Sequence, residues 1–147
     1  MTYDNASWHY EGNFPADLPE NAGATHIALF LSWAVLNGLA GDLHIQEFTA
    51  DLAQLRGRAV TPGEWFLSVC DGKLVDEDLN EEGNRFTHAY YAGDDGLHTG
   101  EGYYLSDYVD AFPDAETAYH VPDTWASFDT LAPILARRLA AWRKKSP

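Results

Sequence analysis

Residues 25–36 read Thr-His-Ile-Ala-Leu-Phe-Leu-Ser-Trp-Ala-Val-Leu, and this stretch decides the fold. Its large apolar residues recur at helical spacing on one side, and further apolar residues fill the other side. A helix that is apolar on nearly all faces lies at the centre of a domain, with several neighbours packed on it. We therefore expect a central helix that starts at an N-cap Thr25 and stops before Gly38.

Helical periodicity continues after the central stretch. Apolar positions predict a second helix over 45–55, with Ile45 and Phe48 in its buried stripe. The sequence Thr61-Pro62-Gly63-Glu64 combines an N-cap, a proline at the first helical position and the glutamate of a capping box. It predicts a third helix that ends near Gly72.

Two further segments also have helical spacing. Residues 79–92 predict a helix that Gly83 weakens by about 1 kcal/mol relative to alanine. After a turn at residues 93–96, tyrosines and Phe112 predict a short helix over 103–112 in which Asp107 faces water.

The last apolar stripe predicts a helix over 127–143 with basic residues in its final turns, where the helix dipole favours cations. Pro133 lies inside this stripe, and a proline in a helix interior costs about 3 kcal/mol. Two consecutive helices that meet near Leu131 are the alternative to one long helix.

The first 24 residues differ from the rest of the chain. Pro15 and Pro19, with turn-forming residues around them, exclude a long helix and favour an extended arm. No repeat or linker divides the chain. The sequence therefore predicts a mainly α protein of one compact domain over 1–147, with an extended arm (1–24), a helical body (25–145) and irregular loops.

Composition suggests the compartment. The single cysteine, Cys70, cannot form an internal disulfide, and the N-terminus lacks the pattern of a signal peptide. The longest apolar run, Ile27 to Leu36, is well short of the roughly 18–20 residues that span a bilayer. We expect a soluble cytoplasmic protein.

Charge is distributed unevenly along the chain. All 23 acidic residues lie between Asp4 and Asp129, whereas five of the nine basic residues follow residue 136, and the net charge is −14. Such a body repels nucleic acid and anionic lipid and attracts a basic protein through a field that salt screens. The basic tail is explained by neutralisation within the molecule rather than by an anion site.

A run of tyrosines and acids allows two interpretations. Its rings could face inward while its acids keep the protein soluble, or tyrosines surrounded by carboxylates could contact a partner rich in arginine and lysine. The candidate partner-binding residues are Asp94, Asp95, Glu101, Tyr103, Tyr104, Asp107, Tyr108 and Asp110.

The sequence contains no recognisable catalytic or metal motif. The six histidines are spread without ligand spacing, and Cys70 has the setting of a small buried hydrophobe. We therefore expect no enzyme activity, no cofactor and no metal. The alternative is a small-ligand or enzyme site beneath the N-terminal arm, lined by Trp8, His9, His26 and Trp33.

Short motifs along nearly the whole chain resemble those of an uncharacterised family of small acidic bacterial proteins. Proteins of this general type are often immunity partners of bacterial toxins, so the resemblance implies that role but assigns it to no residue. The motifs are Tyr3-Asp4-x-Ala6-x-Trp8-His9, Phe14-Pro15, Leu18-Pro19, Gly23-Ala24-Thr25-His26-Ile27, Asp71-Gly72-Lys73-Leu74, Tyr90-Tyr91, Asp107-Tyr108 and Tyr119-His120-Val121-Pro122-Asp123-Thr124-Trp125.

Three hypotheses follow. The leading one is an acidic module that neutralises a basic bacterial toxin by covering its active surface. The second is the small-ligand site under the arm. The third is an oligomeric protein that is acidic only for solubility.

Overall fold

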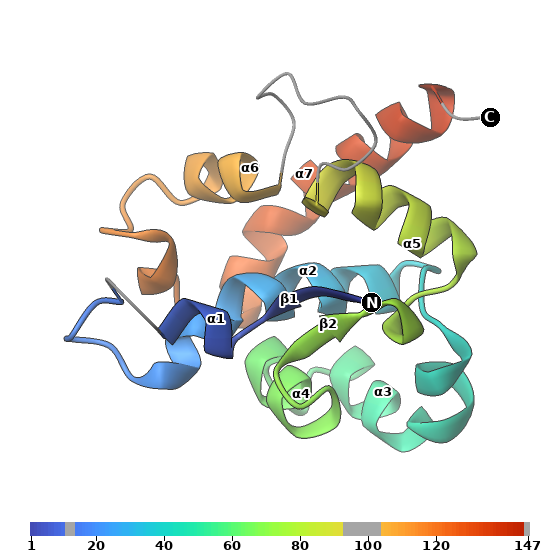
Figure 1. The fold of residues 1–147 in the computed structure, drawn as a ribbon, viewed down its shortest axis with the longest axis horizontal. Coiled ribbons are helices and arrows are strands. Elements are labelled where there is room, and N and C mark those ends of the chain that lie inside the picture. The colour runs from blue at the N-terminus through green and yellow to red at the C-terminus, as the bar shows by residue number, and fades with distance from the viewer. Residues whose placement is uncertain (11–13, 93–103, 146–147) are drawn as a thin grey trace.

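Helix α2, Thr25–Leu36, forms the centre of the computed structural model, which describes residues 1–10, 14–92 and 104–145 (Figure 1). Every residue from Thr25 to Val35 is buried, so the predicted central helix is confirmed. The N-cap is Ala24 rather than Thr25, and no side chain caps this end. Gly38, at a φ of +84° that a side chain would disfavour, follows the C-cap Asn37.

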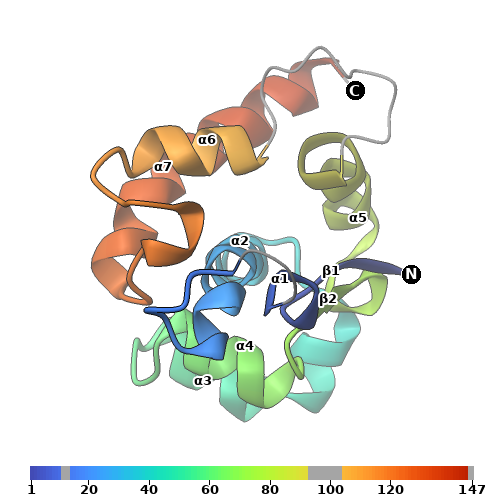
Figure 2. The same cartoon turned by 60° about the vertical axis from the view of Figure 1, so that its left-hand side comes forward.

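Helices cover α2 from several directions. Figure 2 shows it between α3 and α4 on one side and α6 and α7 on the other. The mainly α fold is thus confirmed. The elements are β1 (Thr2–Asn5), α1 (Ser7–Tyr10), η1 (Glu20–Ala24), α2, η2 (Leu43–Glu47), α3 (Thr49–Arg56), α4 (Pro62–Val69), β2 (Lys73–Val75), η3 (Asp76–Asp78), α5 (Glu81–Thr87), η4 (His88–Ala92), α6 (Tyr104–Ala111), η5 (Ala118–His120) and α7 (Trp125–Lys145).

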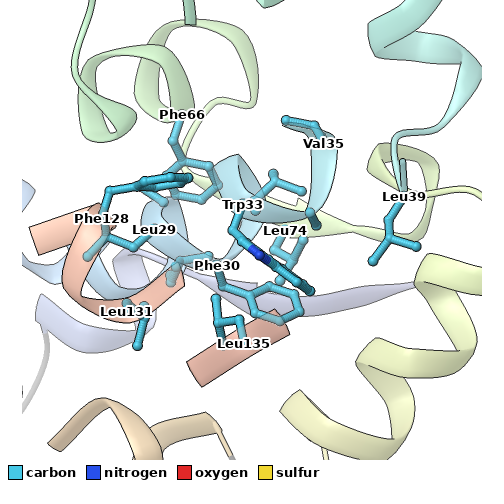
Figure 3. Close-up of a cluster of buried hydrophobic side chains, with 14 of the residues drawn as sticks. Leu29, Phe30, Trp33, Val35, Leu39, Phe66, Leu74, Phe128, Leu131 and Leu135 are labelled. Atoms are coloured by element: carbon cyan, nitrogen blue, oxygen red, sulfur yellow. The ribbon is translucent and has the colours of Figure 1, made fainter. Parts of the chain in front are cut away.

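The core is the layer of side chains between α2 and the helices on either side. α2 contacts α4 below it and α7 above it, and the cluster combines aromatic rings with leucines. Figure 3 shows Leu29, Phe30 and Trp33 of α2, Phe66 of α4, Leu74 of β2, and Phe128, Leu131 and Leu135 of α7.

The N-terminal arm is partly a strand. β1 pairs antiparallel with β2, from Thr2 opposite Val75 to Asn5 opposite Lys73, with an irregularity between Thr2 and Asp4. Over residues 1–10 and 14–24 the arm contains no long helix, as its prolines predict, but α1 and η1 interrupt the extended chain. The strand pairing fixes the arm across some seventy residues of sequence.

The predicted helix over 45–55 is wrong in its first half. The π-helix η2 ends at Glu47, and the α-helix α3 begins at Thr49. The wider π turn rotates the chain so that His44 is buried, and Ile45, expected in the buried stripe, is 51% exposed.

The capping box that starts α4 is confirmed. Thr61 Oγ1 accepts from the Glu64 N–H at 3.1 Å, and Glu64 Oε1 accepts from the Thr61 N–H at 2.8 Å. The carboxylate of Asp123 accepts from the Thr61 hydroxyl at 2.6 Å and from the Gly63 N–H at 2.8 Å. These bonds join the start of α4 to the chain that leads into α7.

α7 is one helix with Pro133 inside it, so the alternative of two helices is wrong. Pro133 cannot bond to the carbonyl of Asp129, but both residues lie on the exposed face, where water can replace the lost bond. The buried face carries Phe128, Leu131 and Leu135. Among the described residues, no helix combines the length and apolar character needed to cross a membrane.

Gly83 allows α5 to approach the chain after α2, and a Gly83→Ala substitution should destabilise the protein. The added Cβ would lie 2.8 Å from the carbonyl oxygen of Leu39 and 3.1 Å from the Cβ of Leu79. We expect a loss of about 1–3 kcal/mol in urea denaturation, despite the higher helix propensity of alanine. Gly57→Ala is the control, because its Cβ would meet only ordinary contacts from 3.4 Å. Equal stabilities of the two variants would contradict this interpretation.

Candidate functional site

A cavity of about 260 Å³ lies where the N-terminal arm crosses the start of α2. Its wall combines titratable side chains with tyrosine rings from segments far apart in the sequence. The lining residues are Asp4, His9, His26, Tyr91, Tyr104, Leu105, Ala118 and Tyr119.

Asp4 is the centre of the polar wall. Strand β1 turns its side chain inward, and the residue is 7% exposed. Its carboxylate accepts hydrogen bonds from the Nε2 of His9 at 2.8 Å and from the hydroxyl of Tyr91 at 2.5 Å. The backbone N–H of Asn5 donates to the same carboxylate at 2.8 Å. A buried charge is tolerated when it is paired in this way.

His9 links Asp4 to Tyr119. It lies on the short helix α1, and its Nδ1 is 2.8 Å from the hydroxyl oxygen of Tyr119. An ionised Asp4 only accepts hydrogen bonds, so the His9 tautomer with its proton on Nε2 donates to Asp4, and its Nδ1 then accepts from the Tyr119 O–H. The lone pairs of the Tyr119 oxygen therefore remain available to a donor.

His26 is the third polar group of the wall. It is the second residue of α2, is buried, and has its Nε2 3.4 Å from an Asp4 carboxylate oxygen. Its Nδ1 is buried and has no hydrogen-bond partner among the described residues. Its ring lies edge-on to the ring of His9, with centroids 4.5 Å apart. The Tyr104 hydroxyl donates to the His26 carbonyl, which fixes the start of α2 against α6.

The charges of these groups follow from their surroundings. Burial alone would raise the pKa of Asp4, but the nearby His26 imidazole and the hydrogen bonds from His9 and Tyr91 outweigh it and hold the pKa well below its usual range. Burial lowers the pKa of His26, against the opposing effect of Asp4. Burial also raises the pKa of Tyr91, so this hydroxyl stays protonated. The wall therefore carries an ionised carboxylate beside a neutral His26.

The arm site predicted from the sequence is half present. The structure brings His9 and His26 together, but Trp8 is 56% exposed and Trp33 is buried in the core, and neither lines the cavity. Trp33 instead packs beside Phe86. Asp4 and Tyr119 were missed as site residues. Asp4 stands in the same motif as His9, but nothing local in the sequence shows that its side chain is buried or that Tyr119 contacts His9.

The tyrosine–acid contact patch is wrong for three of its members. Tyr104 and Tyr108 are buried, so they cannot contact a partner at the surface. Asp107, expected to face water, is also buried. Asp110 is exposed as expected. The remaining members, Asp94, Asp95, Glu101 and Tyr103, lie outside the described residues.

The basic tail explains the burial of Asp107. The Nε and Nη2 of Arg138 donate to its two carboxylate oxygens at 2.8 and 2.9 Å, and the Tyr90 hydroxyl adds a bond of 2.6 Å. Arg143 forms a similar two-point contact with Glu82, the shorter bond being 2.7 Å. Neutralisation of tail cations within the molecule is therefore confirmed for these two arginines.

Two more groups bring histidine and acid together. The buried His44 and Asp78 form a group with the half-buried Cys70, in which the His44 Nε2 lies 2.8 Å from Asp78. Asp78 also accepts from the Val75 N–H at 2.9 Å, so this group holds η2 against η3. Burial and the nearby Asp78 raise the pKa of the Cys70 thiol, consistent with a residue that is not a nucleophile.

The other group lies at the surface. It consists of Asp17, Glu116 and His120, and both acids are exposed. Along the sequence, the histidines are not spaced like metal ligands. Within the residues that the structure describes, the fold nevertheless assembles three groups of potential metal ligands from distant positions.

A separate groove is acidic. Four exposed carboxylates border it, and within the described chain only Glu81 has an ion-pair partner, the exposed Arg85. The groove lies beside η2, η3 and the start of α5. Its acids are Asp42, Glu47, Glu77 and Glu81.

A family model described as "Domain of unknown function (DUF7832)" matches residues 2–121. This confirms the expected membership of an uncharacterised family and assigns no activity. Comparisons with curated proteins and with solved structures gave no match.

Because His26 is buried, we expect the stability of the protein to depend on pH. The pKa of His26 is lower in the folded protein than its value of about 6.5 in the unfolded chain, so below that pH the unfolded chain binds the extra proton. Stability is therefore lost as the pH falls through about 6.5, by up to about 1 kcal/mol down to pH 5.5. Urea denaturation across this range should show a shallower loss for His26→Gln. An unchanged slope would contradict a lowered pKa of His26 in the folded protein.

Proposed function

The chain belongs to the DUF7832 family of domains of unknown function, which assigns it no activity. From the geometry of the cavity, we propose that the protein binds a small molecule beneath the N-terminal arm. The observation that supports this most is the ionised Asp4 in the cavity wall, held by His9 and Tyr91. The proposal concerns binding alone.

A purely structural role for this network is the competing explanation. An arm could be held to a helix by apolar contacts without the cost of burying a carboxylate. The network of Asp4, His9 and His26 instead lines a cavity. Buried titratable groups that line a pocket are a feature of binding sites. These considerations favour a ligand site.

The lining indicates the kind of ligand. A cavity of about 260 Å³ has room for roughly one ring and a short substituent. The rings of Tyr91 and Tyr104 are stacked 4.9 Å apart and, with Leu105, give one side an apolar surface. The other side offers the Tyr119 oxygen as an acceptor. The ionised Asp4 disfavours an anion, so the metal-free protein should prefer a neutral ring with a hydroxyl or amine donor.

A pair of matched probes tests this preference. Benzyl alcohol should bind in the millimolar range, as expected of a ligand with so few atoms, whereas benzoate, the same ring with a negative charge, should not. Ala118→Phe fills the cavity and should abolish binding in protein-observed NMR. Ala136→Phe places the same side chain on the exposed face of α7 and should bind like wild type. Binding that survives Ala118→Phe would contradict the proposed site.

The acidic groove favours a second candidate function, in which the chain neutralises a basic protein. Four carboxylates on one groove, in a protein with net charge −14, would steer a lysine- and arginine-rich partner toward it. The resemblance to immunity proteins suggests a bacterial toxin as that partner, met in the cytoplasm. The buried Tyr104 and Tyr108 have no part in this surface.

The second candidate predicts salt-sensitive binding that depends on the groove. A deca-arginine peptide should bind wild type at low salt and weaken as the salt concentration rises. Changing Asp42, Glu47, Glu77 and Glu81 together to their amides should weaken binding more than the same change at Glu20, Asp71, Asp110 and Asp114, which are exposed elsewhere. Equal weakening in fluorescence anisotropy would mean that net charge alone binds the peptide, and would remove the groove from the proposal.

A further inference from the structure

We propose that Asp4, His9 and His26 form a binding site for a divalent transition-metal ion, at the polar end of the cavity. This inference deepens the proposed ligand site, since the ion would be the group that the ligand meets. Two imidazoles and one carboxylate are donors that Zn²⁺, Co²⁺ and Fe²⁺ accept in proteins.

The spacing of the three side chains suits one ion. One ligand atom from each residue lies within 4.8 Å of the others. Metal–ligand bonds of about 2.0–2.2 Å at tetrahedral angles separate neighbouring ligand atoms by roughly 3.3 Å. The 3.4 Å between His26 and Asp4 is close to that value and too long for a strong hydrogen bond. The Nε2 of His9 lies 2.8 Å from the other carboxylate oxygen, Oδ1, so this distance would have to open slightly.

Tyr119 provides the outer support that a ligating histidine requires. If the Nε2 of His9 binds the ion, its ring proton must lie on Nδ1, 2.8 Å from the Tyr119 oxygen. That N–H then donates to Tyr119, which changes from donor to acceptor and turns its own O–H away from His9. Carboxylates, carbonyls and similar acceptors hold ligating imidazoles in this way. Tyr119 is therefore a positioning residue of the site.

His26 supplies the second reason to expect an ion. Its imidazole is buried, and its Nε2 lies 3.4 Å from the Asp4 carboxylate, which is a long contact for a buried ring. A polar ring is rarely buried with so little compensation. Coordination of its Nε2 would provide the strong contact that the hydrogen-bond network does not.

The cavity leaves the ion accessible. The three ligands occupy one wall, while Leu105 and Ala118 line other parts of the cavity and offer no competing donor. A site with three protein ligands and an open position binds a water or a substrate atom at that position. The ion would also change the formal charge of the cluster from negative to positive. The metal-loaded protein should then accept an anion that the metal-free protein disfavours.

Metal titration tests the proposal without any organic ligand. Full-length protein stripped with a chelator should bind one equivalent of Zn²⁺ in calorimetry, and Co²⁺ should give the visible absorption of a histidine-coordinated ion. His9→Gln should lose this binding. His9 lies on a short, partly exposed helix, so its loss is compatible with folding. Tyr119→Phe keeps all three ligands and should weaken binding by about 10–100-fold.

His120→Gln is the matched control. It removes the histidine of the surface group with Asp17 and Glu116, and the one-equivalent binding should be unchanged. Binding that is lost in His120→Gln, or retained in His9→Gln, would overturn the proposal. Wild-type affinity in Tyr119→Phe would overturn the coordination of His9 through Nε2.

Benzoate then separates this inference from the proposed ligand site. It should bind the Zn²⁺-loaded protein and not the metal-free form. Failure to bind the loaded protein would overturn the open coordination position. Benzyl alcohol binding to the metal-free protein does not depend on the ion, so the ligand cavity can fail while the metal site stands, and the reverse also holds.

Discussion

The fold depends on the need to cover α2 on every side. A helix with buried residues from Thr25 to Val35 has no face to offer to water, so the chain must supply neighbours around its whole circumference. α4 and α7 cover two sides with apolar side chains. The remaining surface, at the start of the helix, is covered by the N-terminal arm and by the segment around η5. The polar network is located there, because His26 lies at that end of α2.

The segments that cover the start of α2 also form the candidate site. Neither the arm nor the first turn of α2 would form a polar cavity alone. β1 contributes the carboxylate of Asp4, α1 contributes the imidazole of His9, and η5 contributes the hydroxyl of Tyr119. His9 and Tyr119 are 110 residues apart in the sequence, so the geometry exists only in the folded domain.

Local patterns predicted most of the helices, because each depends on residues close together in sequence. The capping box at Thr61 and the apolar faces of α2 and α7 are of this kind. The errors arose where a distant partner overrides the local pattern. The sequence pattern places Asp107 at the surface, but in the structure it is buried and paired with Arg138. The pattern also places Ile45 in the buried stripe, but His44 occupies the inner position beside Asp78. The sequence suggested His9 and His26 as neighbours beneath the arm. It did not identify Asp4 and Tyr119 as site residues, because their roles depend on contacts that form only in the folded protein.

The affinity of the site depends on how firmly β1 is paired with β2. Within the described residues the sheet has two strands, so the backbone of β1 pairs with a neighbouring strand along one of its edges. Such a strand can detach by local opening while the helical core remains folded. Detachment would remove Asp4 and separate the ligating groups. The observed affinity of the site would then be scaled by the fraction of molecules in which the strand is docked. Occupation of the site would in turn favour the docked strand and slow hydrogen exchange of its amides.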